Sequence, residues 1–401
     1  MNILLLGNGF DLAHGLPTKY VDFLEWVKAE YGLYTELREQ GKEIIDKLDP
    51  VRVNWAILSY PSKMQGKVTI LAEKAKQIEI WQSIDNNIWI DYFLNNPMYQ
   101  RENWIDFESE ISKVIQSIDK DFEGKEFDEE IEHLSNSYLE SHFLYKGFDS
   151  LFEDDNGHRG GKEKTTYSEL EKRLEDDLNR LIRALEIYLT EYVEKIECTV
   201  FSPDIKEVTI QINEKFHSAL CSKILCFNYT SIFEKVYGKI YGQDYNYIHG
   251  KADTKNTLET NNMVLGIDEY LPIERRNKDV EFIAFKKFYQ RIYKQTGCEY
   301  KEWIDKIKKR NFECTKKGIG FAEMHNLYIF GHSLDITDGD ILRDLILTEN
   351  VHTTIFYLNK KVLGQQIANL VKVLGQDELI KRTGGSTKTI EFRQQREMEK
   401  R

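Results

Sequence analysis

Residues 1–18 read MNILLLGNGFDLAHGLPT, and this stretch decides the fold class of the chain. The apolar run Ile3 to Leu6 stands directly before Gly7 and predicts a short, buried parallel strand. A helix is expected after Pro17, because proline favours the first turn of a helix. A glycine-rich loop between a strand and a helix is typical of a site that holds the phosphates of a nucleotide.

This first loop departs from the usual dinucleotide-binding fingerprint. Leu12 occupies the position of the third glycine of G-x-G-x-x-G, and the lysine of a P-loop is missing. A tight turn without a ligand therefore stays an alternative. The loop residues that we expect to contact a nucleotide are Gly7, Asn8, Gly9, Phe10, Asp11, His14 and Thr18.

Composition narrows the class of protein. The chain has 401 residues and is 41% hydrophobic, which is enough for two or three structural units. Its net charge of -12 argues against broad nucleic-acid binding and against a membrane surface as partner. The first apolar run is too short for a membrane span or a secretory signal, so we expect a cytoplasmic protein.

The rest of the chain predicts an α/β protein with a large helical insertion. Short apolar runs at 223–227, 245–249, 263–267, 326–330 and 353–358 alternate with helical stretches, which favours a mainly parallel, Rossmann-like sheet. We expect residues 1–34 and 219–380 to form this core and residues 35–218 to form the insertion. Inside the insertion, Thr166 and Glu169 predict a capping box. Residues 381–401 are expected to be a polar, mobile tail.

Two motifs follow predicted strands. In Phe227-Asn228-Tyr229-Thr230, Asn228 could hold a ribose hydroxyl or a water molecule, or simply cap the next helix. In Ile248-His249-Gly250, His249 could act as a general base, although a lone histidine is more often structural.

A third motif, FGHSLD at residues 330–335, follows a later strand. It is similar to the G-x-S-x-G turn of serine hydrolases, but Asp335 stands where the second glycine should be. Binding of ribose or phosphate by Gly331, His332, Ser333 and Asp335 fits better. In WIDFE at residues 104–108, Asp106 and Glu108 are either a solvated helix start or acids that approach the site.

Taken together, the motifs are more specific than any one of them. GNGFDLAHGLPT, FNYT, YIHGKAD, MVLGIDEY and LYIFGHSLDITDGDI occur in the order seen in the AbiH family of phage abortive-infection proteins, which the chain therefore resembles. That family in turn resembles a divergent branch of the sirtuin-like NAD-binding fold. The resemblance implies that Asn228 and His249 are catalytic and that Gly331 and Ser333 face the adenosine half of NAD.

The resemblance also implies an activity. The zinc-binding C-x-x-C module of sirtuin deacetylases is missing, so no metal is expected, and the implied enzyme is a NAD glycohydrolase that depletes NAD on infection. A phage-derived trigger and a homo-oligomer are possible partners besides NAD. Asn8, Asp11 and His14 differ from the usual sirtuin loop. The alternatives are a non-catalytic nucleotide sensor, a hydrolase using Ser333, and a nuclease using acids such as Asp11, Asp106 and Glu108.

Overall fold

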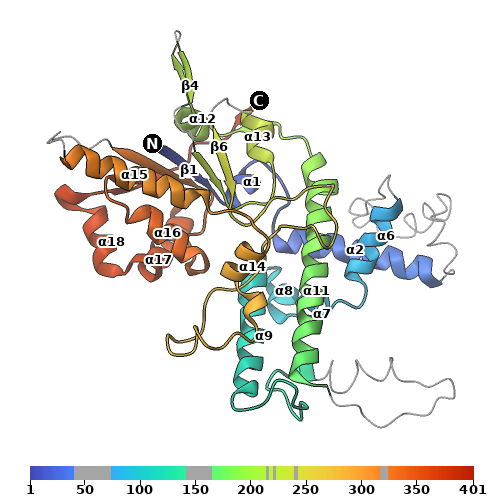
Figure 1. Ribbon diagram of the computed structural model, residues 1–401. Helices are drawn as coiled ribbons and strands as arrows, with labels where there is room; N and C mark the ends of the chain where they lie inside the picture. Colours follow the sequence, from blue (N-terminus) through green and yellow to red (C-terminus); the bar gives the residue numbers. More distant parts are fainter. Residues whose placement is uncertain (40–73, 141–164, 214–215, 220–222, 239–242, 317–323) are drawn as a thin grey trace, which may run out of the picture. The chain divides into compact units, whose positions relative to one another are not determined.

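The computed structural model describes residues 1–39, 74–140, 165–213, 216–219, 223–238, 243–316 and 324–401 (Figure 1). These residues form two compact units. Unit 1 comprises Met1–Lys19, Glu186–Val264 and Arg291–Arg401, and unit 2 comprises Tyr20–Leu185 and Leu265–Gln290. Residues 186–218, which we expected in the insertion, thus belong with the sheet, whereas residues 265–290 belong with the helices.

Unit 1 is built on a six-stranded sheet in the order β6-β5-β1-β7-β8-β9, and every neighbouring pair is parallel. In chain order the strands therefore lie 3-2-1-4-5-6, which is the usual order of dinucleotide-binding α/β folds. The prediction of a parallel, Rossmann-like sheet is confirmed. The strands are β1 (Asn2–Leu6), β5 (Lys223–Cys226), β6 (Asp244–Tyr247), β7 (His325–Phe330), β8 (Val351–Tyr357) and β9 (Ile390–Gln394).

Helices cover both faces of this sheet, as a parallel sheet requires. On one face, buried side chains of the strands pack with those of α15 (Glu299–Lys316), α16 (Gly339–Ile346), α17 (Lys360–Leu374) and α18 (Gln376–Thr383) (Figure 1). On the other face, Phe10 of α1 (Gly9–Ala13) contacts Phe233 and Tyr237 of α13 (Ile232–Tyr237) and Phe330 of β7.

Two sequence predictions about the core are wrong. Residues 381–401 are not simply a polar tail, because β9 is the sixth strand and pairs in parallel with β8. Ile390 is buried while Glu391 is exposed, so the strand alternates as an edge strand does. The second wrong prediction is the strand at residues 263–267, which do not form one. Ile267 makes only an isolated bridge with Lys286, and the backbone N–H of Leu265 donates to the side chain of Gln290.

Smaller elements complete unit 1. The short strand β10 (Glu399–Lys400) pairs antiparallel with β2 (Val200–Phe201), and β3 (Ile210–Asn213) pairs antiparallel with β4 (Phe216–Ala219). The remaining helices are α12 (Pro203–Thr209), the π-helical turn Tyr188–Tyr192, and the 3-10 turns Val193–Lys195, Ile336–Asp338 and Gly385–Thr387.

Unit 2 is helical. Its core is aromatic: the Phe107 ring stacks on those of Tyr20 and Phe93, each with 4.1 Å between ring centroids. The capping box is confirmed, because Thr166 Oγ1 accepts from Glu169 N and Glu169 Oε2 accepts from Thr166 N. The helices are α2 (Tyr20–Glu39), α6 (Lys74–Ile84), α7 (Ile88–Leu94), α8 (Pro97–Glu102), α9 (Phe107–Phe122), α10 (Ser137–Leu139), α11 (Tyr167–Ile187) and α14 (Lys287–Tyr293), of which α11 and α14 run on into unit 1.

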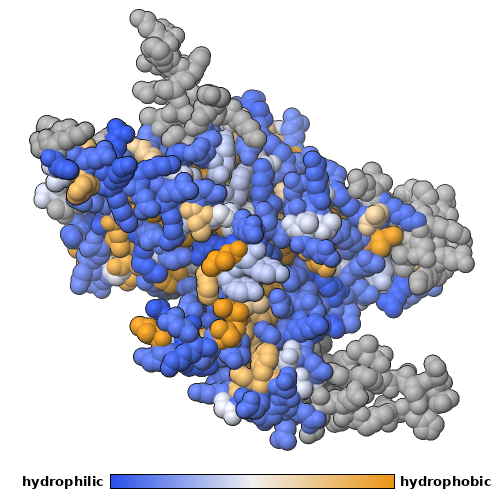
Figure 2. Space-filling view, in the orientation of Figure 1, coloured by the Kyte–Doolittle hydropathy of each residue, from blue (hydrophilic) through white to orange (hydrophobic). Residues whose placement is uncertain are grey.

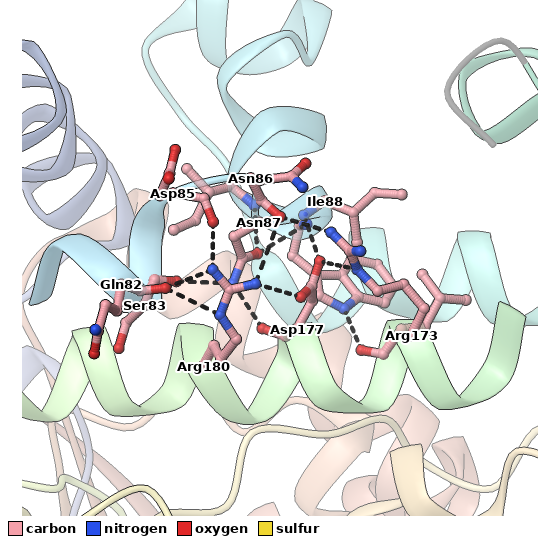
Figure 3. Close-up of polar contacts among 12 residues, drawn as sticks. Gln82, Ser83, Asp85, Asn86, Asn87, Ile88, Arg173, Asp177 and Arg180 are labelled. Atoms are coloured by element: carbon pink, nitrogen blue, oxygen red, sulfur yellow. Dashed lines mark hydrogen bonds and ion pairs between the residues drawn. The ribbon is translucent and has the colours of Figure 1, made fainter. Parts of the chain in front are cut away.

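A buried carboxylate ties α11 to the turn between α6 and α7 (Figure 3). Asp177 accepts from the backbone N–H of Ile88 at the start of α7, and it also binds Arg173 and Arg180. Arg180 donates in addition to the carbonyl oxygens of Gln82 and Asp85. This network satisfies the first turn of α7 and the charge of Asp177 together, so we assign it a structural role.

The face of the molecule in Figure 2 is mostly hydrophilic, with smaller hydrophobic areas. None of the helices in the described ranges combines the length and the apolar character that crossing a membrane requires.

Candidate functional site

Polar side chains gather where the parallel strands of unit 1 end. Asp11 follows β1, Asn228 follows β5, His249 follows β6, and Asp338 follows β7. The chain order of the strands reverses between β1 and β7, and ligands of open α/β sheets bind at the carboxyl ends of the strands beside such a point. The fold therefore brings residues from four separate motifs to the edge where a ligand is expected.

The first cluster is centred on Asp11, which is 1% exposed. One of its carboxyl oxygens accepts from Asn228 Nδ2 at 2.9 Å, and the other accepts from Thr230 Oγ1 at 2.7 Å. Burial raises the pKa of Asp11 to about 7, although both hydrogen bonds act in the opposite direction. Asp11 therefore changes its protonation state close to neutral pH.

Asn228 is held by this contact in one orientation. Because its Nδ2 is used by Asp11, its amide oxygen Oδ1 points elsewhere, and this oxygen is buried with no hydrogen-bond partner in the part of the chain that the structure describes. A buried acceptor without a donor costs about 1–3 kcal/mol, so a ligand or water hydrogen at Oδ1 would be favoured.

The second cluster is a carboxylate between two histidines. Asp338 Oδ1 lies 3.0 Å from Nε2 of His249, and Asp338 Oδ2 lies 3.4 Å from Nε2 of His332. His332 Nδ1 accepts from the backbone N–H of Leu334, so its proton is on Nε2, facing the carboxylate. If His249 donates from Nε2 in the same way, its lone pair is on Nδ1, which makes Nδ1 the basic atom.

The ring of Phe227 connects the two clusters. It lies 5.2 Å from the ring of His249 and 4.5 Å from that of His332, measured between centroids, and it directly precedes Asn228 in the chain. An apolar ring beside both imidazoles limits their contact with water, which strengthens the electrostatic attraction to Asp338.

The glycines of the first loop allow it to lie very close to the loop that contains Gly331. A Cβ atom on Gly7 would lie 2.6 Å from the Cα of His332, and one on Gly331 would lie 2.2 Å from the backbone nitrogen of Phe10. The backbone N–H groups of Gly7 and Gly9 donate to the carbonyl oxygens of Phe330 and Gly331. These two amides, which we expected to face a phosphate, are thus bound to the last residue of β7 and to the loop that follows it.

The family of the chain follows from comparison with known proteins. A family model described as "Bacteriophage abortive infection AbiH" matches residues 3–358. The chain belongs to the AbiH family. Membership places it among proteins of anti-phage abortive infection, and the AbiH match includes every site residue described above. No curated protein and no solved structure matches the chain.

The other loop residues that we expected to bind a nucleotide have partners within unit 1. Asn8 and Thr18 bind each other, with Thr18 Oγ1 donating to Asn8 Oδ1 at 2.7 Å. Both ring nitrogens of His14 are engaged, Nδ1 with the carbonyl oxygen of Phe10 and Nε2 with the hydroxyl of Tyr237. Burial lowers the pKa of His14, which favours its neutral form. Phe10 is a buried residue of the aromatic core.

Residues 332–338, which include most of the FGHSLD motif, have two kinds of side chain. Ser333 is exposed, and its carbonyl oxygen accepts from Asn369, while Asp335 caps the following turn by accepting from Thr337 N. His332 and Asp338 instead turn inward. The ion pair of Asp338 with His249 could not be read from the motif, because the two residues are 89 positions apart in the chain.

The acids of the WIDFE motif belong to unit 2. Asp106 caps α9 by accepting from the N–H groups of Glu108 and Ser109, and Glu108 forms an ion pair with Lys287. Within the described ranges there is no group of three or more His, Cys, Asp or Glu side chains with the spacing of a metal site. Thr230 is a site residue that sequence reasoning missed, because a threonine two residues after an asparagine carries no distinctive signal.

Proposed function

We propose that this AbiH protein hydrolyses NAD to nicotinamide and ADP-ribose during phage infection. The observation that carries the proposal is the pairing of buried His249 with Asp338 at the carboxyl edge of the sheet, with Asn228 at the end of an adjacent strand. A base fixed by a carboxylate and an amide with an open acceptor atom are what the reaction needs. The motifs of the chain resemble those of sirtuin-like proteins, and the strand order is the dinucleotide-binding one, so NAD is the substrate that fits best.

The bond to be broken joins the nicotinamide nitrogen to C1′ of the ribose. Nicotinamide is a cationic leaving group, so the electron pair of the bond neutralises it without a general acid. The ribose passes through an oxocarbenium-like state, as in other glycosidic cleavages. Water then bonds to C1′ and gives up a proton, which His249 accepts on its basic nitrogen.

Asp338 prepares His249 for this step. A carboxylate that accepts from one imidazole nitrogen fixes the tautomer and stabilises the imidazolium formed when the other nitrogen takes a proton. General-base help of this kind is worth about 10²- to 10⁴-fold in rate. Because Asp338 acts through His249, it is a positioning residue for the reaction.

Asn228 supplies orientation. Asp11 holds its amide, so Oδ1 is presented as an acceptor for a ribose hydroxyl or for the attacking water. The diphosphate role expected for the loop of Gly7 and Gly9 stays a prediction, and it would have to use groups other than the amides of these two glycines, which already have backbone partners.

The test measures NAD in phage-infected cells that express the wild type, His249→Ala or Asn228→Ala. NAD is expected to fall with the wild type and to stay at its uninfected level with either variant. His352→Ala is the matched control, because His352 lies on β8 outside the site. An infection that the wild type aborts while NAD remains constant would refute the proposal.

A further inference from the structure

The segment that follows His249 is held in place by residues far away in the sequence. It continues from the end of β6 through Gly250 and comes back beside His249 at Val264, whose backbone N–H donates to the carbonyl oxygen of His249. A Cβ on Gly250 would lie 2.1 Å from the carbonyl oxygen of Asn262, so the two ends of this loop are in close contact. We call residues 250–264 the His249 loop.

The first outside contact comes from Glu186, a carboxylate with 0% exposure. One of its oxygens accepts from the backbone N–H of Asp253 and from Asn256 Nδ2, and the other accepts from Asn261 Nδ2. A buried carboxylate needs such donors, and all three of these belong to the His249 loop. Without Glu186, two asparagine side chains and one backbone amide would lose their acceptor.

The second outside contact comes from Lys294. Its Nζ donates to the carbonyl oxygen of Met263 at 2.6 Å, next to the residue that closes the loop. Burial lowers the pKa of Lys294 to about 8, while the negative charge of Glu186 acts in the opposite direction. The two side chains are therefore close enough to attract each other electrostatically. Nearby, Thr296 donates to the carbonyl oxygen of Ile248, directly before His249.

Both residues stand where the chain re-enters unit 1. Glu186 is the first residue of unit 1 after Leu185, and Lys294 is the fourth after Gln290. Thus, within four residues of each point where the chain re-enters unit 1, a charged side chain (Glu186 or Lys294) binds the His249 loop.

We propose that Glu186 and Lys294 are positioning residues that fix the His249 loop, and through it His249, at the two places where the chain re-enters unit 1. The effect on catalysis rests on the proposed function. The claim that Glu186 and Lys294 hold the loop in place does not. A partner that displaced Glu186 or Lys294 would thereby change the position of His249.

The test compares the full-length wild type with Glu186→Gln, in which an amide group can no longer accept from all three donors. Hydrogen–deuterium exchange of peptides covering residues 250–264 is expected to become about tenfold faster in the variant. Lys195→Gln is the matched control and should leave exchange unchanged, because Lys195 lies nearby in the chain and, among the described residues, its exposed side chain forms an ion pair with Glu191. Asn256→Ala removes a single contact and should give a smaller acceleration, which keeps the test valid if Glu186→Gln does not fold.

NAD turnover of the same proteins separates the inference from the proposed function. Faster exchange with a lower kcat supports the positioning role. Unchanged exchange, or faster exchange with full kcat, overturns it. If the wild type itself never cleaves NAD, the proposed function fails, and the exchange data alone decide whether Glu186 holds the loop.

Discussion

The buried carboxyl of Asp11 gives a prediction about stability that depends on pH. Its pKa is about 7 in the folded protein, whereas an ordinary exposed aspartate has a pKa of 3.8. Between these values the folded chain keeps the proton that the unfolded chain has released. Unfolding therefore releases a proton in this window, and stability falls as the pH rises through it.

Asp11→Asn removes this effect and keeps the shape of the side chain. At about pH 5 Asp11 is neutral in the folded state but largely ionised in the unfolded state, so only part of the effect is present, about 1.2 pH units × 1.36 kcal/mol, or about 1.6 kcal/mol. Above about pH 7.5 the wild type carries the full cost of a buried charge, which is at most about 3 units × 1.36 kcal/mol, or about 4 kcal/mol. Asparagine can still offer its oxygen to Asn228 and its amide to the hydroxyl of Thr230.

The assay is guanidinium unfolding of both proteins at about pH 5 and about pH 8.5, followed by circular dichroism. We expect the variant to gain at least about 1 kcal/mol over the wild type on going to the higher pH. Asp377→Asn is the control, because Asp377 is exposed at the start of α18 and its replacement relieves no burial cost. If the difference between wild type and Asp11→Asn is the same at both pH values, the reasoning is refuted.

Three further outcomes follow from the packing. Gly331→Ala should lower the free energy of unfolding by at least about 2 kcal/mol, because its Cβ would lie 2.2 Å from the nitrogen of Phe10 at a φ of +72°; an unchanged denaturation midpoint would contradict this. Asp177→Ala should cost about 2–3 kcal/mol in a denaturant titration, since it leaves Arg173 and Arg180 without their carboxylate. Deleting residues 389–401 should expose the edge of β8 and cause aggregation measurable by light scattering, and a monomeric, soluble product would count against the role of β9.

Several elements could be predicted from the sequence because their signals are local. The apolar run before Gly7 became β1, which is buried and pairs with strands on both sides. The capping box at Thr166 needs only residues within one helical turn, and it forms as expected. The alternation of strands and helices after residue 222 likewise indicated the parallel sheet.

Other elements depend on distant neighbours and were missed or wrong. β9 contains Glu391 and Arg393 beside Ile390 and Phe392, so its polar residues suggested a tail, and only the edge of β8 makes it a strand. Residues 263–267 are apolar enough for a strand, yet Val264 and Leu265 bind His249 and Gln290 instead of a neighbouring strand. In both cases the local sequence pattern fits a strand and a loop equally well. Whether a strand forms depends on whether a neighbouring strand is available to pair with it.

The sequence by itself determined that the chain has a parallel sheet and that Asn228, His249 and the motif of His332 follow its strands. Only the tertiary structure decided their partners. Asp11 and Asn228 are 217 residues apart in the chain, and His249 and Asp338 are 89 apart. Hydrophobic periodicity indicates which segments are strands, but it does not encode the order β6-β5-β1-β7 that brings their ends together. The same holds for the glycines of the first loop. They are needed because the loop of Gly331 lies too close to leave room for a Cβ atom, and this contact exists only in the folded protein.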